Sequence, residues 1–308
     1  MKDAAKILID CDPGIDDALA LMLAFASDEL ELTGITTVAG NVGVEHTARN
    51  AAALCALAGV DVPVAAGAAG PLTGKAHTAS AVHGNNGLGD IDLPPGAPLS
   101  DLNAVDFMYQ ALKEADGRLE LIALGPLTNI ARLLEQYPDS LSLIPRLTLM
   151  GGSLARGNVT PWAEFNFYAD PEAADRVLRS GIEIHMYGLD VTTQALLDDQ
   201  EMDRISAWSG KASQALSAMI ACYSSFYRSK GIQGILLHDP LAVAGVIKPD
   251  LTGKKAFALG VHTGQDERRG QVMILDGEGM DRNVHVSLEL HRDEFLRFFM
   301  SRIELVCS

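Results

Sequence analysis

The sequence feature that most constrains the fold lies near the N-terminus, at residues 10–17 (DCDPGIDD). The apolar run before it, residues 7–9, is typical of a buried strand, and Pro13-Gly14 then forces a turn. Asp16-Asp17 begins an apolar segment of helical length, residues 18–26. Four carboxylates therefore fall within eight residues, between the end of a strand and the first turn of a helix. In open α/β sheets, ligands bind in the crevice at this position.

This segment carries more negative charge than helix capping requires. Asp16-Asp17 alone would be explained as caps, because carboxylates at a helix start accept orphan N–H groups and suit the positive end of the helix dipole. Asp10 and Asp12 are harder to explain, since closely packed like charges repel unless a positive group lies between them. No Lys or Arg lies between residues 6 and 49. The segment therefore predicts a divalent cation, and all-oxygen ligation favours Ca²⁺ or Mg²⁺ over zinc.

Length and charge narrow the class of protein. The chain has 308 residues, 48% of them hydrophobic, and α/β chains of this size often form one domain, so we expect a single domain over residues 1–308. The formal net charge is −16, without a basic cluster. This charge argues against nucleic acid and against an anionic membrane surface as partners. A neutral or cationic small molecule is the expected substrate.

Cysteine usage predicts a cytoplasmic protein. The four cysteines form no CxxC and no disulfide-like pattern, which favours free thiols in a reducing compartment. We expect no signal peptide, because residues 1–6 run directly into a strand. No apolar run reaches the roughly 18 residues that a membrane-spanning helix needs, so no membrane segment is expected.

Expected strands and helices alternate along the chain, which predicts parallel βαβ units with right-handed crossovers. The expected fold is α/β: an open, mostly parallel, Rossmann-like twisted sheet with helices on both faces and a small C-terminal β extension. Expected strands cover residues 7–9, 30–38, 62–66, 119–124, 147–150 and 182–189, with hairpin strands within 257–290 around Asp276-Gly277. Expected helices cover 18–26, 45–58, 105–114, a segment ending near 136, a segment beginning at 170, 200–227, 238–246 and 293–305.

Three connections are expected to be irregular. Residues 67–100 are rich in Gly, Pro and Asn, and a loop of this length is usually functional or mobile, so we interpret it as a lid or rim over the crevice. Residues 153–169 are expected to form a polar loop. Residues 231–237 are expected to form a flexible connection.

Polar residues gather where the expected strands end: at residues 10–17, 124–129 and 158–166, with His238-Asp239 at a helix start. Parallel strands would bring these loops to one edge of the sheet. Carboxylates and amides without a basic residue suit the vicinal hydroxyls of a polyhydroxyl ligand, whereas a phosphate would require a Gly-rich anion cradle or Lys and Arg. The Walker A pattern and a properly placed GxGxxG are both absent.

Each of these residues also has an ordinary structural interpretation. Glu164 and Asn166 are equally well explained as loop caps. His83 and His238, taken singly, are better explained as hydrogen-bonded histidines. His238 is the more suggestive of the two, because Asp239 beside it couples a titratable acid to a candidate metal ligand.

Residues 10–18 (DCDPGIDDA) resemble the N-terminal signature of the inosine–uridine-preferring nucleoside hydrolases. The similarity continues in one order through TTVAGN (36–41), VHG (82–84), GPLTN (125–129), MGG (150–152), GN (157–158), AEFN (163–166), DPEAA (170–174), GLDVT (188–192) and HD (238–239). It spans most of the chain and is therefore highly specific. Within the family, residues 151–190 and 227–229 look most like the bacterial non-specific ribonucleoside hydrolases.

The resemblance implies a calcium-dependent N-glycosidase that splits purine and pyrimidine ribonucleosides into ribose and free base. It implies that Asp12, Asp17 and Asp239 bind Ca²⁺ through carboxylates and Leu124 through its main-chain carbonyl. The ion would also hold the ribose 2′- and 3′-hydroxyls and one water, for which Asp12 would be the general base. The positions that match the sugar-binding and base-binding sites of the family are Asp16, Asn41, His83, Asn158, Glu164, Asn166, Tyr227 and His238. Relatives are dimers or tetramers, so a homodimer or homotetramer is expected.

The residue types support this chemistry independently of the resemblance. Glycosidic cleavage passes through an oxocarbenium-like state, and carboxylates and amides would stabilise the positive charge that grows on the sugar. The leaving base needs a proton or a hydrogen bond, and His238 is the expected donor for purines. Asp239 beside it would favour the protonated imidazole, although less so when Asp239 binds a metal.

Two departures from the family pattern concern the rim of the crevice. Many relatives carry Glu-Ser after the His-Gly pair, whereas this chain has Asn85-Asn86. Trp162 is bulky for its loop, and packing the loop down is a better explanation for it than stacking on the base.

Two other functions share part of this pattern. A haloacid-dehalogenase-type phosphatase also carries Asp-x-Asp after a strand and uses Mg²⁺, but Pro13-Gly14 fits it poorly. A non-catalytic nucleoside- or sugar-binding protein would not need both Asp12 and His238.

Overall fold

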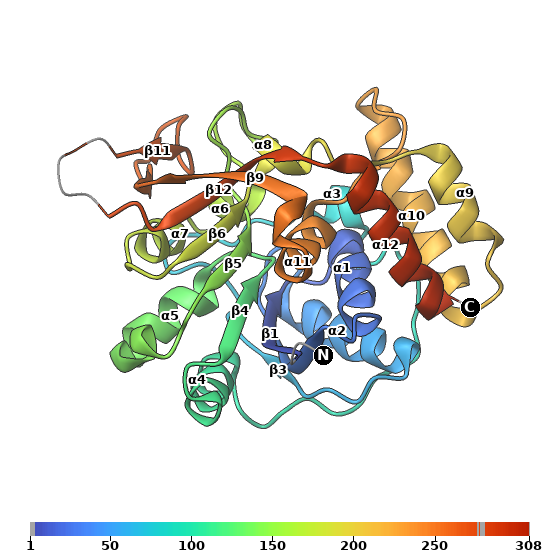
Figure 1. The fold of residues 1–308 in the computed structure, drawn as a ribbon, viewed down its shortest axis with the longest axis horizontal. Helices are drawn as coiled ribbons and strands as arrows, with labels where there is room; N and C mark the ends of the chain where they lie inside the picture. The colour runs from blue at the N-terminus through green and yellow to red at the C-terminus, as the bar shows by residue number, and fades with distance from the viewer. Residues whose placement is uncertain (1–3, 276, 278–280, 308) are drawn as a thin grey trace.

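The structure is a computed structural model, and it describes residues 4–275, 277 and 281–307. An eight-stranded sheet runs through the molecule (Figure 1). Its order is β3 (Val64–Ala66), β2 (Leu30–Thr37), β1 (Ala5–Cys11), β4 (Leu119–Ala123), β5 (Leu147–Met150), β6 (Ile184–Tyr187), β12 (Val284–Leu290) and β9 (Thr252–Phe257). Neighbouring strands are parallel throughout, except β12 and β9, which are antiparallel. The predicted fold class is confirmed.

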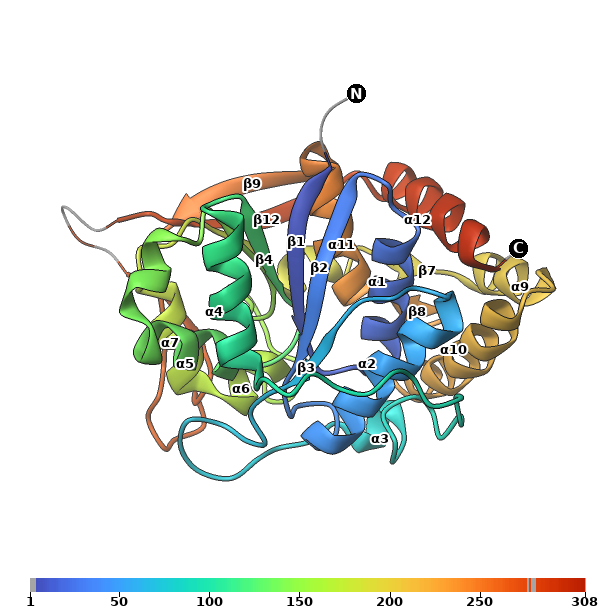
Figure 2. The same cartoon turned by 90° about the horizontal axis from the view of Figure 1, so that it is seen from below.

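Helices cover both faces of this sheet (Figure 2). One face is covered by α4 (Ala104–Ala115), α5 (Thr128–Gln136) and α7 (Pro171–Leu178), and the other by α1 (Ile15–Phe25), α2 (Val44–Ala58), α11 (His238–Ile247) and α12 (Arg292–Cys307). Each helical layer encloses its own apolar core. Residues 7–9 of β1 are fully buried between these layers, which explains why they are all apolar.

The remaining elements are short or peripheral. Beside α12 lie α9 (Asp199–Ala207) and α10 (Lys211–Ser229) (Figure 1). The short helices are α3 (Ser80–His83), α6 (Phe165–Ala169), α8 (Leu189–Thr192), η1 (Pro138–Ser142) and η2 (Pro249–Leu251). Two antiparallel pairs, β7 (Leu196–Leu197) with β8 (Ile235–Leu236) and β10 (Leu259–Val261) with β11 (Val272–Ile274), lie outside the main sheet. No helix in the described part of the chain is long and apolar enough to cross a bilayer.

Three local predictions are corrected by the structure. The expected polar loop at 153–169 contains α6, and the expected flexible connection at 231–237 contains β8. The strands that flank Asp276-Gly277 do not pair with each other: β11 pairs with β10, whereas β12 joins the main sheet between β6 and β9. Asp276 itself lies outside the described residues. The two strand corrections have one physical reason, because β8 pairs with β7 and β12 pairs with β6 and β9, and local patterns do not encode such pairing.

The parallel register brings the polar loops to one edge of the sheet, as expected. Asp10 near the end of β1 is level with Thr36 on β2 and with Ala123 on β4. The chain therefore leaves three neighbouring strands at the same level, and the residues that follow them face one space.

Candidate active site

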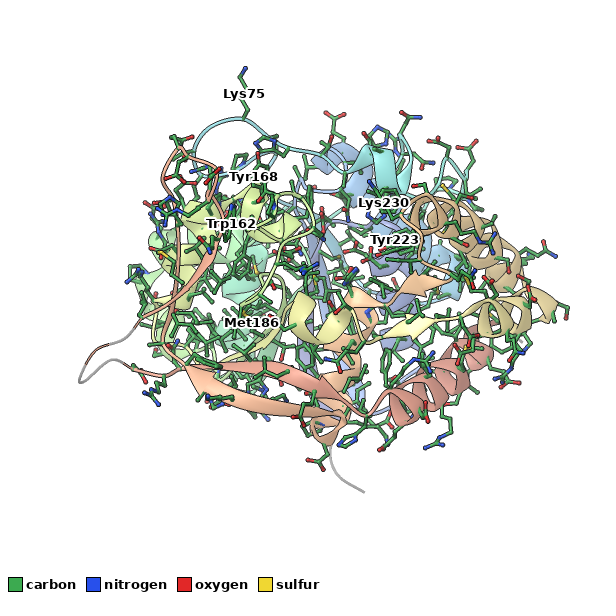
Figure 3. All side chains as sticks on the ribbon, turned by 90° about the horizontal axis from the view of Figure 1, so that it is seen from above. Lys75, Trp162, Tyr168, Met186, Tyr223 and Lys230 are labelled. Carbon is green, nitrogen blue, oxygen red and sulfur yellow. The ribbon has the colours of Figure 1, made fainter. Side chains whose placement is uncertain are left out.

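A cavity of about 840 Å³ opens at the carboxyl ends of the parallel strands. In Figure 3, Tyr168 lies on one side of this region, and Tyr223 and Lys230 lie on the other. The predicted site residues that line the cavity are Asp16, Asn41, His83, Asn158, Glu164, Asn166, Tyr227, His238 and Asp239. The other three predicted residues are almost fully buried: Asp12, Asp17 and Leu124.

Asp17 is fixed by the turn that precedes α1. Its Oδ2 accepts hydrogen bonds from Gly14 N at 2.9 Å and from Asn41 Nδ2 at 3.1 Å, and its Oδ1 accepts from Asp12 N at 3.2 Å. The cap interpretation of Asp17 is therefore correct. The same contacts hold its carboxylate rigidly at the head of α1.

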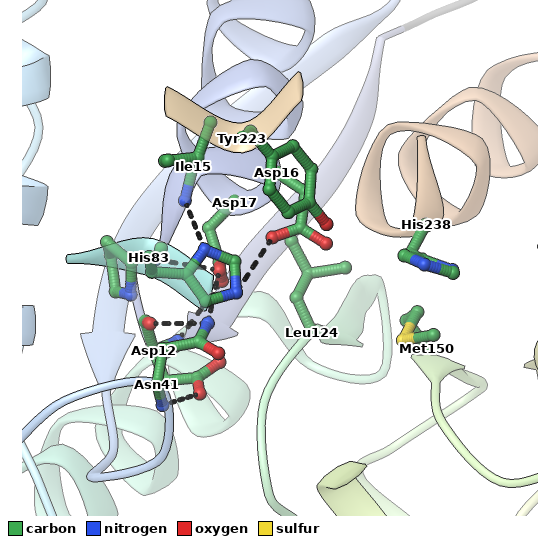
Figure 4. Close-up of polar contacts among 12 residues, drawn as sticks. Asp12, Ile15, Asp16, Asp17, Asn41, His83, Leu124, Met150, Tyr223 and His238 are labelled. Carbon is green, nitrogen blue, oxygen red and sulfur yellow. Dashed lines mark hydrogen bonds and ion pairs between the residues drawn. The ribbon is translucent and has the colours of Figure 1, made fainter. Parts of the chain in front are cut away.

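Asp12 is held by Asn41, to which it is hydrogen-bonded (Figure 4), and by two glycines. Its Oδ2 accepts a hydrogen bond of 2.6 Å from Asn41 N, and its carbonyl accepts one of 3.1 Å from Asn41 Nδ2. A Cβ at Gly40 would lie 2.0 Å from Oδ2, and a Cβ at Gly125 would lie 2.6 Å from Oδ1. Both loops therefore need glycine, because the chain passes directly against the Asp12 carboxylate.

Three acidic side chains meet beneath the cavity. Oxygens of Asp16, Asp17 and Asp239 lie within 4.8 Å of one another, and all three residues are buried. Burial and the neighbouring carboxylates raise the pKa of Asp16 to about 8 and that of Asp239 well above its usual value. Burial also raises the pKa of Asp17 to about 6 and that of Asp12 well above its usual value. The resemblance implied Asp12, Asp17 and Asp239 as the carboxylate ligands. The three acidic residues that lie together in the structure are instead Asp16, Asp17 and Asp239.

The Leu124 carbonyl is hydrogen-bonded to a side chain that lines the cavity. It accepts a hydrogen bond of 2.8 Å from Asn166 Nδ2, which also donates to Met150 O at 3.1 Å. Asn166 thus connects the ends of β4 and β5. Its amide orients the carbonyl that the sequence resemblance assigns to the metal.

Glu164 caps α6, which confirms the structural interpretation of this residue. Its Oε1 accepts from Asn166 N at 2.9 Å, and its Oε2 accepts from Gly152 N at 2.8 Å and from Phe167 N at 3.2 Å. Burial raises its pKa to about 7 despite these bonds. Glu164 also lines the cavity, so capping does not remove it from the site.

His83 is held as a neutral imidazole. Its Nδ1 accepts a hydrogen bond of 3.0 Å from Ile15 N at the start of α1, so its ring proton is on Nε2. Nε2 lies 4.0 Å from Asp16 Oδ1. Burial lowers the pKa of His83 to about 3. His83 therefore packs against the acidic cluster without neutralising it.

His238 lies in a chain of hydrogen-bonding groups. Its Nδ1 is 2.8 Å from Thr192 Oγ1, its Nε2 is 3.0 Å from the Tyr227 hydroxyl, and this hydroxyl is 3.3 Å from that of Tyr223. Burial lowers the pKa of His238 to about 4. The expectation that Asp239 favours the protonated imidazole is therefore wrong, because desolvation of the ring dominates.

Sequence reasoning missed several residues at this site. Thr192 and Tyr223 complete the hydrogen-bonded chain, and Arg156 and Lys230 bring positive charge to the cavity lining. A signal for Tyr223 was present, because it lies one helical turn before Tyr227 and so on the same face of α10. The basic residues lie on segments whose placement depends on tertiary packing.

The two departures noted in the sequence do not face the cavity. The side chain of Asn85 donates to Asp90, and Asn86 Oδ1 accepts from the backbone of the same turn. Trp162 is 39% exposed and is not part of the cavity lining. Asn158 is exposed at the rim, where its Oδ1 accepts from Phe165 N at 3.0 Å.

A family model described as inosine-uridine preferring nucleoside hydrolase matches residues 7–297. The chain belongs to this family. Membership makes it an N-glycosyl hydrolase that acts on ribonucleosides, in agreement with the site. The phosphatase and the non-catalytic binding protein are not supported by this match.

Relatives that align over almost the whole chain agree with the family. The chain is 42% identical to a non-specific ribonucleoside hydrolase, RihC, of Escherichia coli O127:H6, over 97% of this chain and 98% of the relative. It is 42% identical to uridine nucleosidase 1 of Arabidopsis thaliana, over 84% of this chain and 78% of the relative. The solved structure of a purine-preferring ribonucleoside hydrolase from Gardnerella vaginalis superposes with a TM-score of 0.94, at 34% identity over 98% of this chain and 99% of the other.

Proposed function

We propose that this nucleoside hydrolase is calcium-dependent, that it cleaves both purine and pyrimidine ribonucleosides, and that Asp12 activates the attacking water. The observation that carries the proposal is the group of buried carboxylates formed by Asp12, Asp16, Asp17 and Asp239. No described Lys or Arg forms an ion pair with any of them. Such a site is costly unless a cation compensates it, and oxygen ligands suit a hard ion.

The donor set fits calcium. Asp12, Asp17 and Asp239 would hold the ion with carboxylate oxygens, and Leu124 with its carbonyl oxygen. Asp16 lies among these carboxylates and lines the cavity, which suits a hydrogen bond to a ribose hydroxyl. When bound, the ion would lower the pKa of a water molecule and orient it.

Asp12 is suited to accept the proton of this water. Its Oδ2 accepts a hydrogen bond of 2.6 Å from Asn41 N, which fixes the carboxylate. Its carboxylate would take up the proton of the calcium-bound water, as a general base does. The carboxylates and amides around it would stabilise the positive charge on the sugar.

The chain of Thr192, His238, Tyr227 and Tyr223 is suited to the leaving base. His238 is neutral, so it would pass a proton on through hydrogen bonds rather than carry a permanent charge. The hydroxyl of Tyr227 lies between His238 and Tyr223 and lines the cavity. A purine would accept such a hydrogen bond at its imidazole nitrogen.

The breadth of substrates is supported by the cavity and by relatives. The volume of about 840 Å³ exceeds what one nucleoside needs. The similar RihC protein is named for non-specific activity. We also propose a cytoplasmic homodimer or homotetramer that serves purine and pyrimidine salvage; the free cysteines support a reducing compartment.

A release assay tests the function. Inosine, adenosine, uridine and cytidine are incubated with the protein in calcium buffer, and free base and reducing sugar are followed. We expect release from all four, loss of release in Asp12→Ala, and no loss in Asp203→Ala, which changes an exposed aspartate of α9. Loss of activity in excess EGTA, restored by Ca²⁺, tests the metal. Folded protein that binds inosine without releasing hypoxanthine would refute the catalytic proposal.

A further inference from the structure

A second group of metal-ligating side chains lies at the other end of the sheet. Glu183, His185 and His285 are at the amino ends of β6 and β12, whereas the active site is at the carboxyl ends. One ligand atom from each of the three lies within 4.8 Å of the others. The hydrolase chemistry uses none of these residues.

The sheet register places the three side chains together. His185 and His285 are register partners on neighbouring parallel strands, so their side chains point to the same face. Their ring centroids are 5.3 Å apart, at an interplanar angle of 67°. Glu183 precedes His185 by two residues and so lies on this face, with its Oε1 3.2 Å from His185 Nε2.

We propose that Glu183, His185 and His285 form a site for a borderline divalent transition metal, represented by Zn²⁺, distinct from the calcium site. Two imidazole nitrogens and one carboxylate oxygen are a ligand set used for zinc, with water in the fourth position. In a tetrahedral site with bonds of about 2.0–2.1 Å, two ligands lie about 3.3 Å apart. The distance of 3.2 Å between Glu183 and His185 matches this edge.

Exposure allows an ion to enter. The side chain of Glu183 is 53% exposed and that of His185 is 14% exposed. The carboxylate therefore faces solvent, whereas the His185 imidazole is held in the sheet. An exposed glutamate can adjust around an ion, whereas the histidines are fixed by their strands.

Two neighbouring positive charges act on this site. Arg146 forms an ion pair of 2.6 Å with Glu120, but its charge still contributes to lowering the pKa of His185. Lys254 packs over the Tyr187 ring, 5.5 Å from its centroid, and its charge contributes to the low pKa of His185. Lys254 should therefore oppose cation binding, and its removal should tighten binding.

An ion at this site would connect β12 to β6. These strands join the C-terminal antiparallel pair β12–β9 to the parallel part of the sheet. Zn²⁺ should therefore raise the thermal stability of the protein and leave nucleoside hydrolysis in calcium buffer unchanged. The proposal does not rest on the proposed function.

Titration calorimetry with ZnCl₂ tests the site, with the full chain in a large excess of Ca²⁺ so that the acidic cluster is occupied. We expect one Zn²⁺ per chain in the wild type, and affinity at least about tenfold weaker in His185→Ala, His285→Ala and Glu183→Gln. Glu183→Gln replaces a half-exposed side chain by one of the same shape, so this variant should fold. It therefore still tests the site if a histidine variant fails to fold. His46→Ala, in α2, is the matched control and should bind as the wild type does.

Lys254→Gln supplies a test in the opposite direction. It should bind Zn²⁺ more tightly than the wild type, which a non-specific surface effect would not produce. Absence of binding in the wild type, or equal affinity in the wild type and in Glu183→Gln, would overturn the proposal.

Discussion

Gly40→Ala should inactivate the enzyme without unfolding it. The added Cβ would lie 2.0 Å from Asp12 Oδ2 and 2.8 Å from Pro126 Cδ. The backbone of Gly40 is not in the left-handed region, so the effect is steric rather than conformational. Neither neighbour can move away easily, because Asp12 is buried and the Pro126 side chain is a ring closed onto its own backbone.

The size of the effect follows from these distances. To reach ordinary contact of 3.4 Å, Oδ2 and Cβ must separate by about 1.4 Å more. Such a shift breaks the hydrogen bond of 2.6 Å from Asn41 N that orients the Asp12 carboxylate. Misplacement of a reacting group by about 1 Å costs on the order of 10²-fold in rate. Overpacking of a buried site costs about 1–3 kcal/mol of stability.

The assay compares kcat/KM for inosine and uridine with thermal denaturation in the same buffer. Gly43→Ala is the matched control in the same loop, because a Cβ there meets nothing within 4 Å and its φ is −63°. We expect the control to stay within about 1 kcal/mol of wild-type stability and to keep its activity. A wild-type value of kcat/KM in folded Gly40→Ala would refute the role of Asp12 as general base and the need for Gly40 beside its carboxylate.

Three further predictions follow from the site. In EGTA, the free energy of unfolding should fall as pH rises from about 4 to about 8. The reason is that the pKa in the folded state is about 6 for Asp17 and about 8 for Asp16, whereas the usual value is 3.8. The folded state therefore binds more protons than the unfolded state in this pH range. Denaturation scans with Ca²⁺ should show a flatter profile, and identical profiles would contradict cation compensation. Tyr227→Phe should lower kcat for inosine by about 10–10² while changing uridine less, since it removes the hydroxyl beside His238; equal losses would argue against a leaving-group role. Trp162→Ala should leave KM for both nucleosides unchanged, because Trp162 is outside the cavity lining, and a tenfold rise in KM would show that it contacts the substrate.

Local sequence patterns determined much of this protein. The apolar run at 7–9, the Pro13-Gly14 turn and Asp17 specify a strand, a turn and a capped helix through interactions that span a few residues. Alternating strands and helices specify a parallel sheet, whose carboxyl ends must share one edge. The polar loops were therefore predicted to meet, and the cavity shows that they do.

The protonation and the partners of these residues were decided by tertiary structure. Asp239 next to His238 in sequence predicted a raised imidazole pKa, but burial of the ring lowers it to about 4. Desolvation depends on everything packed around a group, and sequence neighbours are a small part of that environment. The hydrogen bonds from His238 to Thr192 and Tyr227 connect separate elements for the same reason.

Local sequence patterns also did not predict which strands pair over long sequence separations. The apolar alternation at 257–290 indicated strands, but only the folded sheet places β12 between β6 and β9. That placement brings His285 beside His185, 100 residues earlier in the chain. Strand propensity is a property of a segment, whereas register is set by the surface on which the segment packs.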